Sequence, residues 1–202
     1  MKLWADFHPL VLPSAPECPI PVADNALRLA ARDFCVRTRA WRETEDLEAQ
    51  GDTNLFDIDI PTGTELVRFT SADVGGKDFS VFGLGLLPKD WAERDPRPGL
   101  YHVADAAYRV FPMPIAGAAM VIEAAVMPGM TGTGVSDEVF RLYAENIASG
   151  ALCRLMKLPR QPWTDLAMAS YHEAAYERAI HSAANRGFMQ TSPGQHRVQK
   201  WG

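Results

Sequence analysis

The five histidines are the first candidates for acid–base or metal chemistry, but they do not cluster along the chain. His172 and His181 share one predicted helix, yet nine positions separate them, which places them on opposite sides of a helix with 3.6 residues per turn. The stretch "HEAAY" from His172 begins like the zinc-binding pattern H-E-x-x-H and lacks the second histidine. We therefore predict no metal site.

Two glycine-containing stretches could hold a phosphate group. "GLGLLP" from Gly83 starts like a dinucleotide-binding turn, but it lacks the third glycine and no helix pattern follows it. "PGMTGTG" (128–134) runs into a helix start, where backbone amides can bind an anion. Asp137 and Glu138 occupy that positive helix end themselves, and no P-loop lysine is present. We predict a strand at the first stretch and a helix capped by Ser136 at the second.

Asp57 and Asp59 form a possible carboxylate pair, because alternate residues of a strand point to the same face. General acid–base catalysis would need a partner group beside them, and the sequence contains no G-x-S-x-G turn and no evident Ser, His and Asp constellation. A solvated strand face accounts for the pair more simply. We predict no catalytic residue and no cofactor, and hence a protein that is not an enzyme.

Charge is segregated between two neighbouring stretches of the chain. The helix predicted around "AARDFCVRTRAW" (30–41) carries four arginines mainly off its apolar stripe: Arg28, Arg32, Arg37 and Arg39. The stretch 43–60 has no base and seven acids: Glu43, Glu45, Asp46, Glu48, Asp52, Asp57 and Asp59. A solvated strand is one explanation. The alternative is a subunit interface, in which these arginines face the first four acids, either of their own chain or of the next copy in a head-to-tail ring.

Composition and net charge limit the functional classes. The 202 residues, 47% of them hydrophobic, suffice for one domain with a core or for two small lobes. A net charge of −5 disfavours a surface built mainly to neutralise phosphates, although it permits a local basic patch. A nucleic-acid-binding module that uses the four arginines therefore remains a hypothesis, and it predicts salt-sensitive binding of duplex DNA.

Cysteine usage and the apolar runs indicate the compartment. Cys18, Cys35 and Cys153 are far apart and form no C-x-x-C pair, so we expect reduced, structural thiols. Asp6, His8 and Pro9 interrupt the N-terminus before a signal-peptide core could form. No run of about 18 apolar residues occurs, so we expect no membrane span and a protein that stays in the cytoplasm where it is made or joins an assembly there.

The N-terminal part predicts an arm followed by a helix. Residues 1–23 contain five prolines, which remove backbone donors and favour extended structure, so we expect an extended arm. A helix over 24–41 follows, with one apolar stripe at helical spacing: Leu27, Ala31, Phe34, Cys35, Thr38 and Trp41.

Alternation and turn signals predict a β lobe over residues 42–128, arranged as an antiparallel meander or a small sandwich. Helices are expected over 136–157 and 163–186, the second rich in alanine and closed by Gly187, and a C-terminal arm over 187–202. The predicted fold class is α+β. It consists of a three-helix lobe, made by one N-terminal and two C-terminal helices of the adaptor domain 24–186, with an inserted antiparallel β-sheet lobe and extended N- and C-terminal arms.

Several stretches, in this order, resemble the head-to-tail adaptor (connector) proteins of tailed bacteriophages. They span roughly residues 17–186 and comprise "CPIPVADNALRLAARDFCVRTRAWRE", "NLFDIDIPTGTELVRF", "GLYHV", "YRVFPMPIAGAAMVIEAAVMP" and "YAENIASGALCRLMKLPRQPWTDLAMASYHEAAYERAI". No single motif is diagnostic, and the resemblance rests on the ordered set.

The resemblance implies a structural virion protein at the head-to-tail interface. It would form a ring of twelve copies beneath the portal protein, extend the channel through which double-stranded DNA passes without sequence-specific binding, and dock a downstream tail or nozzle protein. It also implies that the C-terminal arm reaches into the portal, with these contact residues: Phe188, Met189, Arg197, Val198, Lys200 and Trp201. The alternative from another class is a small intracellular α+β enzyme or ligand-binding domain with an unrecognised site.

Overall fold

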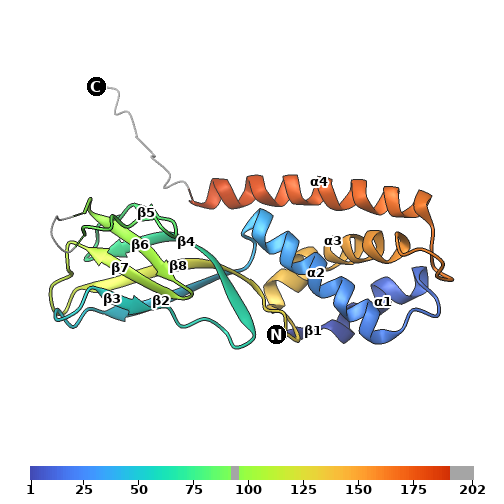
Figure 1. The fold of residues 1–202 in the computed structure, drawn as a ribbon, viewed down its shortest axis with the longest axis horizontal. Coiled ribbons are helices and arrows are strands. Elements are labelled where there is room, and N and C mark those ends of the chain that lie inside the picture. The colour runs from blue at the N-terminus through green and yellow to red at the C-terminus, as the bar shows by residue number, and fades with distance from the viewer. Residues whose placement is uncertain (92–95, 192–202) are drawn as a thin grey trace, which may run out of the picture.

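The computed structural model describes residues 1–91 and 96–191, with side chains to residue 186. A helical lobe and a β lobe lie side by side along the long axis of the molecule (Figure 1). The predicted α+β class is confirmed. The helices are α1 (His8–Val11), α2 (Ile20–Thr38), α3 (Asp137–Met156) and α4 (Leu166–Thr191). The strands are β1 (Lys2–Leu3), β2 (Arg42–Glu48), β3 (Leu55–Asp57), β4 (Thr64–Val74), β5 (Val81–Phe82), β6 (Gly99–Ala104), β7 (Ala107–Phe111), β8 (Ala119–Pro128) and β9 (Gly134–Val135).

The N-terminal segment is folded, so the predicted extended arm over 1–23 is wrong. Short 3₁₀ turns flank α1, and the apolar side chains Trp4, Phe7, Val11 and Ala15 are buried in the helical core. Proline does not prevent these helical turns, because Pro9 and Pro13 stand in a first turn, where no intrahelical N–H is needed. The helical lobe therefore contains α1 as well as the three expected helices.

The boundaries of the long helices also differ from the predicted ones. α2 begins at Ile20 rather than residue 24, with Pro21 in its first turn, and ends at Thr38 because Arg39 adopts the left-handed conformation (φ 54°). Trp41 is thus not a helical residue, although it is buried as expected for a core side chain. α4 continues to Thr191, so Gly187 does not end it. The predicted cap of α3 is confirmed, because the Ser136 hydroxyl accepts a hydrogen bond from the Val139 amide at 3.2 Å.

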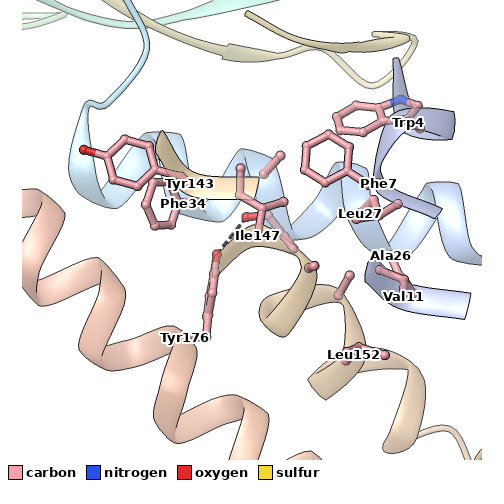
Figure 2. Packing of buried hydrophobic residues seen from close by; sticks show 14 of the residues in the cluster. Trp4, Phe7, Val11, Ala26, Leu27, Phe34, Tyr143, Ile147, Leu152 and Tyr176 are labelled. Atoms are coloured by element: carbon pink, nitrogen blue, oxygen red, sulfur yellow. Dashed lines mark hydrogen bonds between the residues drawn. The ribbon is translucent and has the colours of Figure 1, made fainter. Parts of the chain in front are cut away.

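Figure 2 shows how the N-terminal segment and three helices share the helical core. Trp4 and Phe7 approach α2 from one side, and Tyr176 of α4 reaches it from the other. The Phe34 ring of α2 packs 4.9 Å from that of Tyr143 on α3, centroid to centroid. Contacts between residues more than a hundred positions apart therefore build this lobe.

The β lobe consists of two sheets over one core, the small-sandwich alternative of the prediction. The sheets have the strand orders β2-β8-β4 and β3-β7-β6-β5, and buried residues of both, including Phe69 of β4 and Tyr108 of β7, form one cluster. The expectation of a purely antiparallel lobe is wrong in one place, because β5 and β6 run parallel. The long connection 83–98 permits this crossover. β8 joins the lobes, since Val126 near its end belongs to the helical core.

Candidate interaction surfaces

The arginines of α2 are the first residues to place, because the sequence predicted them at a subunit interface. Arg37 forms two hydrogen bonds with the Glu177 carboxylate of α4, one of them at 2.7 Å between Nη1 and Oε1. Asp33, one helical turn earlier, lies 3.6 Å from Arg37. This hydrogen-bonded pairing raises the pKa of Arg37 and lowers that of Glu177. Arg37 therefore joins α2 to α4 within one chain.

Arg32 joins the helical lobe to the β lobe. Its Nη1 donates to the Pro128 carbonyl at 2.6 Å, and its Nη2 donates to Glu65 Oε2 on β4 at 2.8 Å. The hydrogen bond from Arg32 lowers the pKa of Glu65 below its usual range. The Arg32 side chain is 19% exposed and that of Glu65 is 42% exposed, so this bond at the lobe junction is partly shielded from water.

Arg28 and Trp4 hold the glycine-rich loop 128–134, which the sequence raised as a possible phosphate site. Arg28 Nε and Trp4 Nε1 both donate to the Gly132 carbonyl, at 3.3 and 2.8 Å. Gly134 lies so close to the Lys2 carbonyl that an added Cβ would be 1.8 Å from its oxygen. The loop is thus a packing element whose glycines permit close approach of backbones.

Arg39 has a different environment from the other three arginines. It lines a cavity of about 350 Å³ at the lobe junction together with Arg42 and Arg186. Burial lowers the pKa of Arg39, and the charges of Arg68 and Arg42 lower it further. Arg42 itself bonds Glu123 of β8 at 2.8 Å. Three arginine side chains thus line this cavity, and Arg28, Arg32 and Arg37 form contacts within the helical lobe and across its border.

The acids predicted at the same interface lie along β2, an edge strand of its sheet. Glu43 accepts a hydrogen bond from Trp41 Nε1 at 2.6 Å. Glu45 accepts one from the Asp59 amide at 3.4 Å, and burial, followed by the Asp59 charge, raises the pKa of Glu45. Asp46 and Glu48 are exposed. The assignment of these acids and the four arginines to a subunit interface stays a prediction.

The predicted portal contacts lie at the C-terminal end of the chain. Phe188 and Met189 fall in the last turns of α4, where side chains are not described. The remaining four lie outside the described residues: Arg197, Val198, Lys200 and Trp201.

Buried reactive groups are few in the described part of the chain. Cys18, Cys35 and Cys153 are free thiols, and burial raises the pKa of Cys35 to about 12, which keeps it protonated at neutral pH. Within residues 1–91 and 96–191, no group of three or more His, Cys, Asp or Glu side chains is arranged to hold a metal ion. The helices of the same residues include none that is long and apolar enough to cross a membrane.

The sequence reasoning missed two features that organise these surfaces. The first is the N-terminal segment, whose apolar residues at positions 4, 7, 11 and 15 have helical spacing and are buried. The five prolines of this segment led instead to the prediction of an extended arm. The second is Tyr176, whose hydroxyl donates to the Ala30 carbonyl at 2.7 Å and lies 3.0 Å from Asp33. Nothing in the local sequence distinguishes Tyr176 from a surface tyrosine, since its partners are more than 140 positions away.

The described residues form a helical lobe with a β lobe beside it, and arginine side chains line the cavity at their junction. A family model described as "SU10 adaptor protein" matches residues 8–199, which is nearly the whole chain. The chain therefore belongs to the SU10 adaptor protein family, a family of phage structural adaptors, and the predicted membership in a head-to-tail adaptor family is confirmed. No curated protein matches the chain.

Proposed function

We propose that this chain forms a ring beneath the portal of a tailed phage, joins the capsid head to the tail and extends the DNA channel. The observation that carries the proposal is the family match over residues 8–199, because it covers both lobes and not a single motif. An adaptor works through contacts with the portal above and a tail or nozzle protein below, which places it in the virion after synthesis in the host cytoplasm.

Charge is compatible with passage of DNA through such a ring. The chain has a net charge of −5, and the three arginines of α2, Arg28, Arg32 and Arg37, bond carboxylates or carbonyls of their own chain. Phosphate contacts require accessible lysine and arginine, so a channel formed by this chain would retain DNA weakly. A ring of twelve copies, as the resemblance implies, is the expected assembly.

Size-exclusion chromatography with light scattering tests the ring, using the chain alone, the portal protein alone and their mixture. We expect the mixture to give a complex with many copies of the chain per portal, and electron micrographs of it to show a ring on one portal face. Adaptors can remain monomeric until they meet the portal, so the mixed sample decides. A chain that neither self-assembles nor binds portal would contradict the proposal.

Portal docking is assigned to residues 188–202. Deleting them is expected to abolish portal binding and to leave the circular dichroism spectrum and thermal unfolding nearly unchanged, because the last described residue of the helical core is Ala183. A matched variant that replaces only Trp201 and Val198 with serine retains the length and charge of the arm and tests whether apolar anchoring is the cause. Unchanged docking of the deletion variant would refute the role of the arm.

A further inference from the structure

One long face of α4 is left uncovered by the rest of the described chain. The opposite face packs on α2 and α3, and its buried residues recur at helical spacing: Ala169, His172, Tyr176, Ile180 and Ala183. The exposed side includes Ala167, Tyr171, Ala174 and Arg178, which are three or four positions apart and therefore share one face. Figure 1 shows α4 along the upper side of the helical lobe, as its outermost helix.

Tyr171 has the properties of an interface anchor. It is 61% exposed, and its ring contacts that of its neighbour His172 at 5.3 Å between centroids. Ala167 and Ala174, one turn to either side, have no side chain beyond Cβ, so another surface can approach α4 closely around the tyrosine. Tyrosine and arginine often dominate the binding energy of protein interfaces, and Arg178 lies two turns from Tyr171 on the same face.

Arg178 gives the uncovered face of α4 a positive charge. Its side chain is exposed, and within residues 1–91 and 96–186 it forms no hydrogen bond or ion pair. The two glutamates nearest to it on α4 are already bonded, Glu173 to Lys157 and Glu177 to Arg37. This guanidinium is therefore available for a carboxylate of another molecule.

A groove of about 470 Å³ lies elsewhere on the helical lobe, between the N-terminal segment and α3. Its apolar lining comes from both sides: Pro9, Leu10, Phe140, Leu142 and Ala144. Its polar lining consists of two acids, one arginine and one amide: Asp6, Glu145, Arg141 and Asn146. Glu145 is exposed, and its carboxylate has no partner in the described part of the chain, Arg141 included. The groove thus combines an apolar floor with an unpaired carboxylate.

The groove and the uncovered face of α4 match in size, spacing and charge. The volume of the groove is in the range that holds small organic groups, so it can admit a phenol ring. Phe140 and Glu145 are about 8 Å apart along α3, and Tyr171 and Arg178 are about 10 Å apart along α4. The long arginine side chain covers the difference. A tyrosine at the apolar end of the groove therefore brings Arg178 close to Glu145.

The two surfaces cannot meet within one chain. In Figure 1, α4 lies on the upper side of the helical lobe, and the N-terminal segment with α1 lies on the lower side. Two different surfaces that complement each other form a head-to-tail contact between copies, which closes into a ring when the rotation permits.

We propose that the uncovered face of α4 in one copy docks into the groove between the N-terminal segment and α3 of the next copy. Tyr171 enters the apolar part beside Leu10 and Phe140, and Arg178 pairs with Glu145. This inference rests on the proposed ring and names the contact that holds neighbouring copies together. It uses none of the four arginines that the sequence predicts at a subunit interface, so the two contacts can be tested separately.

Charge reversal with rescue tests this contact. Arg178→Glu alters the face of α4, Glu145→Arg alters the groove, and the double variant carries both changes at exposed positions. Tyr171→Ala removes the anchor, and Tyr171→Phe is its control because it retains the ring. Lys77→Glu and Asp52→Arg, at exposed positions of the β lobe, are the charge-reversal controls. Each variant is mixed with portal protein over a range of concentrations and salt, and ring formation is followed by light scattering and electron microscopy.

We expect Arg178→Glu, Glu145→Arg and Tyr171→Ala each to raise the concentration for half-maximal ring formation by about tenfold or more. The two charge reversals act because like charges then meet at every contact. The double variant should recover most of the assembly, since opposite charges again face each other. The three controls should assemble like the wild type. Thermal unfolding of each variant checks that the fold is retained.

Three outcomes would overturn the inference. If wild-type rings form and the single variants assemble equally well, the contact is wrong while the proposed function stands. If wild type forms no ring with portal, the proposed function and this inference fail together. If Arg178→Glu and the double variant are equally impaired while Glu145→Arg assembles normally, the face of α4 binds the portal rather than a second copy.

Discussion

Each lobe contains a buried tyrosine, but in the described part of the chain only the hydroxyl in the helical lobe has a hydrogen-bond partner. In the helical lobe, the Tyr176 hydroxyl donates to the Ala30 carbonyl and lies within hydrogen-bond distance of Asp33. In the β lobe, the Tyr108 hydroxyl is fully buried without a partner and lies in the field of Glu45 and Asp57. The helical lobe uses its polar groups to join distant segments of the chain. The β lobe, by contrast, buries a tyrosine hydroxyl beside two carboxylates without a hydrogen-bond partner among the described residues.

Phe7→Ala gives the largest expected effect and tests whether the N-terminal segment belongs to the helical lobe. The Phe7 side chain is fully buried and packs edge to face against Phe140 at 4.8 Å between ring centroids. Its removal should lower the free energy of unfolding by about 4 kcal/mol. Leu10→Ala, at a partly exposed position of the same segment, should cost less than about 1 kcal/mol in urea unfolding. Equally small losses of unfolding free energy in both variants would contradict the packing of the N-terminal segment and favour an extended arm.

Gly134→Ala tests the pairing of β1 with β9, which fixes the N-terminus to the loop before α3. The added methyl group would collide with the backbone carbonyl of Lys2, so the strands must separate or the loop must shift. We expect a loss of about 3 kcal/mol in unfolding free energy. The control is Gly83→Ala in the β lobe, where an added Cβ meets nothing within 4 Å. A Gly134 variant as stable as this control would contradict the close approach.

Two tyrosine-to-phenylalanine substitutions sharpen the comparison between the lobes directly. Tyr176→Phe removes a buried hydrogen bond and leaves the Ala30 carbonyl without this donor, so it should cost about 1.5 kcal/mol. Tyr108→Phe removes a hydroxyl that has no partner, so it should leave stability unchanged or raise it by about 1 kcal/mol. Chemical denaturation of both variants measures the difference. Equal losses would show that the Tyr108 hydroxyl is satisfied in solution.

The smallest expected effect is a pH dependence from His172, a buried residue of α4 whose ring nitrogens have no partner. Burial lowers the pKa of His172 below 6.5, so the folded state binds fewer protons than the unfolded state as the pH falls. Its contribution is fully present above pH 6.5 and is lost progressively below it. His172→Leu should flatten this part of the stability profile between pH 7 and pH 5. An unchanged slope would exclude His172 as its source.

Local sequence patterns sufficed for several elements of the fold. The α+β class, the cap at Ser136 and a β lobe with a meander and a small sandwich as alternatives followed from short-range spacing and turn residues, which report local conformation directly. Proline content misled the prediction for the N-terminus, because proline in a first helical turn costs little. The parallel pairing of β5 with β6 could not be predicted, since it depends on the path of the connection 83–98.

The candidate interface could likewise be predicted from the sequence only in part. The sequence located the arginines and acids and their segregation, because charge is a property of each residue alone. It could not decide which arginine meets which partner. Arg32 and Glu65 are 33 positions apart and meet only because the two lobes pack together. Arg37 and Glu177 are 140 positions apart and meet only because α2 packs on α4.

The sequence by itself determined the composition of the core, the separation of helical and alternating segments, the segregation of charge and the resemblance to head-to-tail adaptors. The tertiary structure alone decided that residues 1–18 are part of the helical lobe and that Arg28, Arg32 and Arg37 bond within the chain. It also gathered Arg39, Arg42 and Arg186 at one cavity. The physical reason is that periodicity records which face of an element is apolar, whereas the partner of a charged side chain depends on distances set by the whole fold.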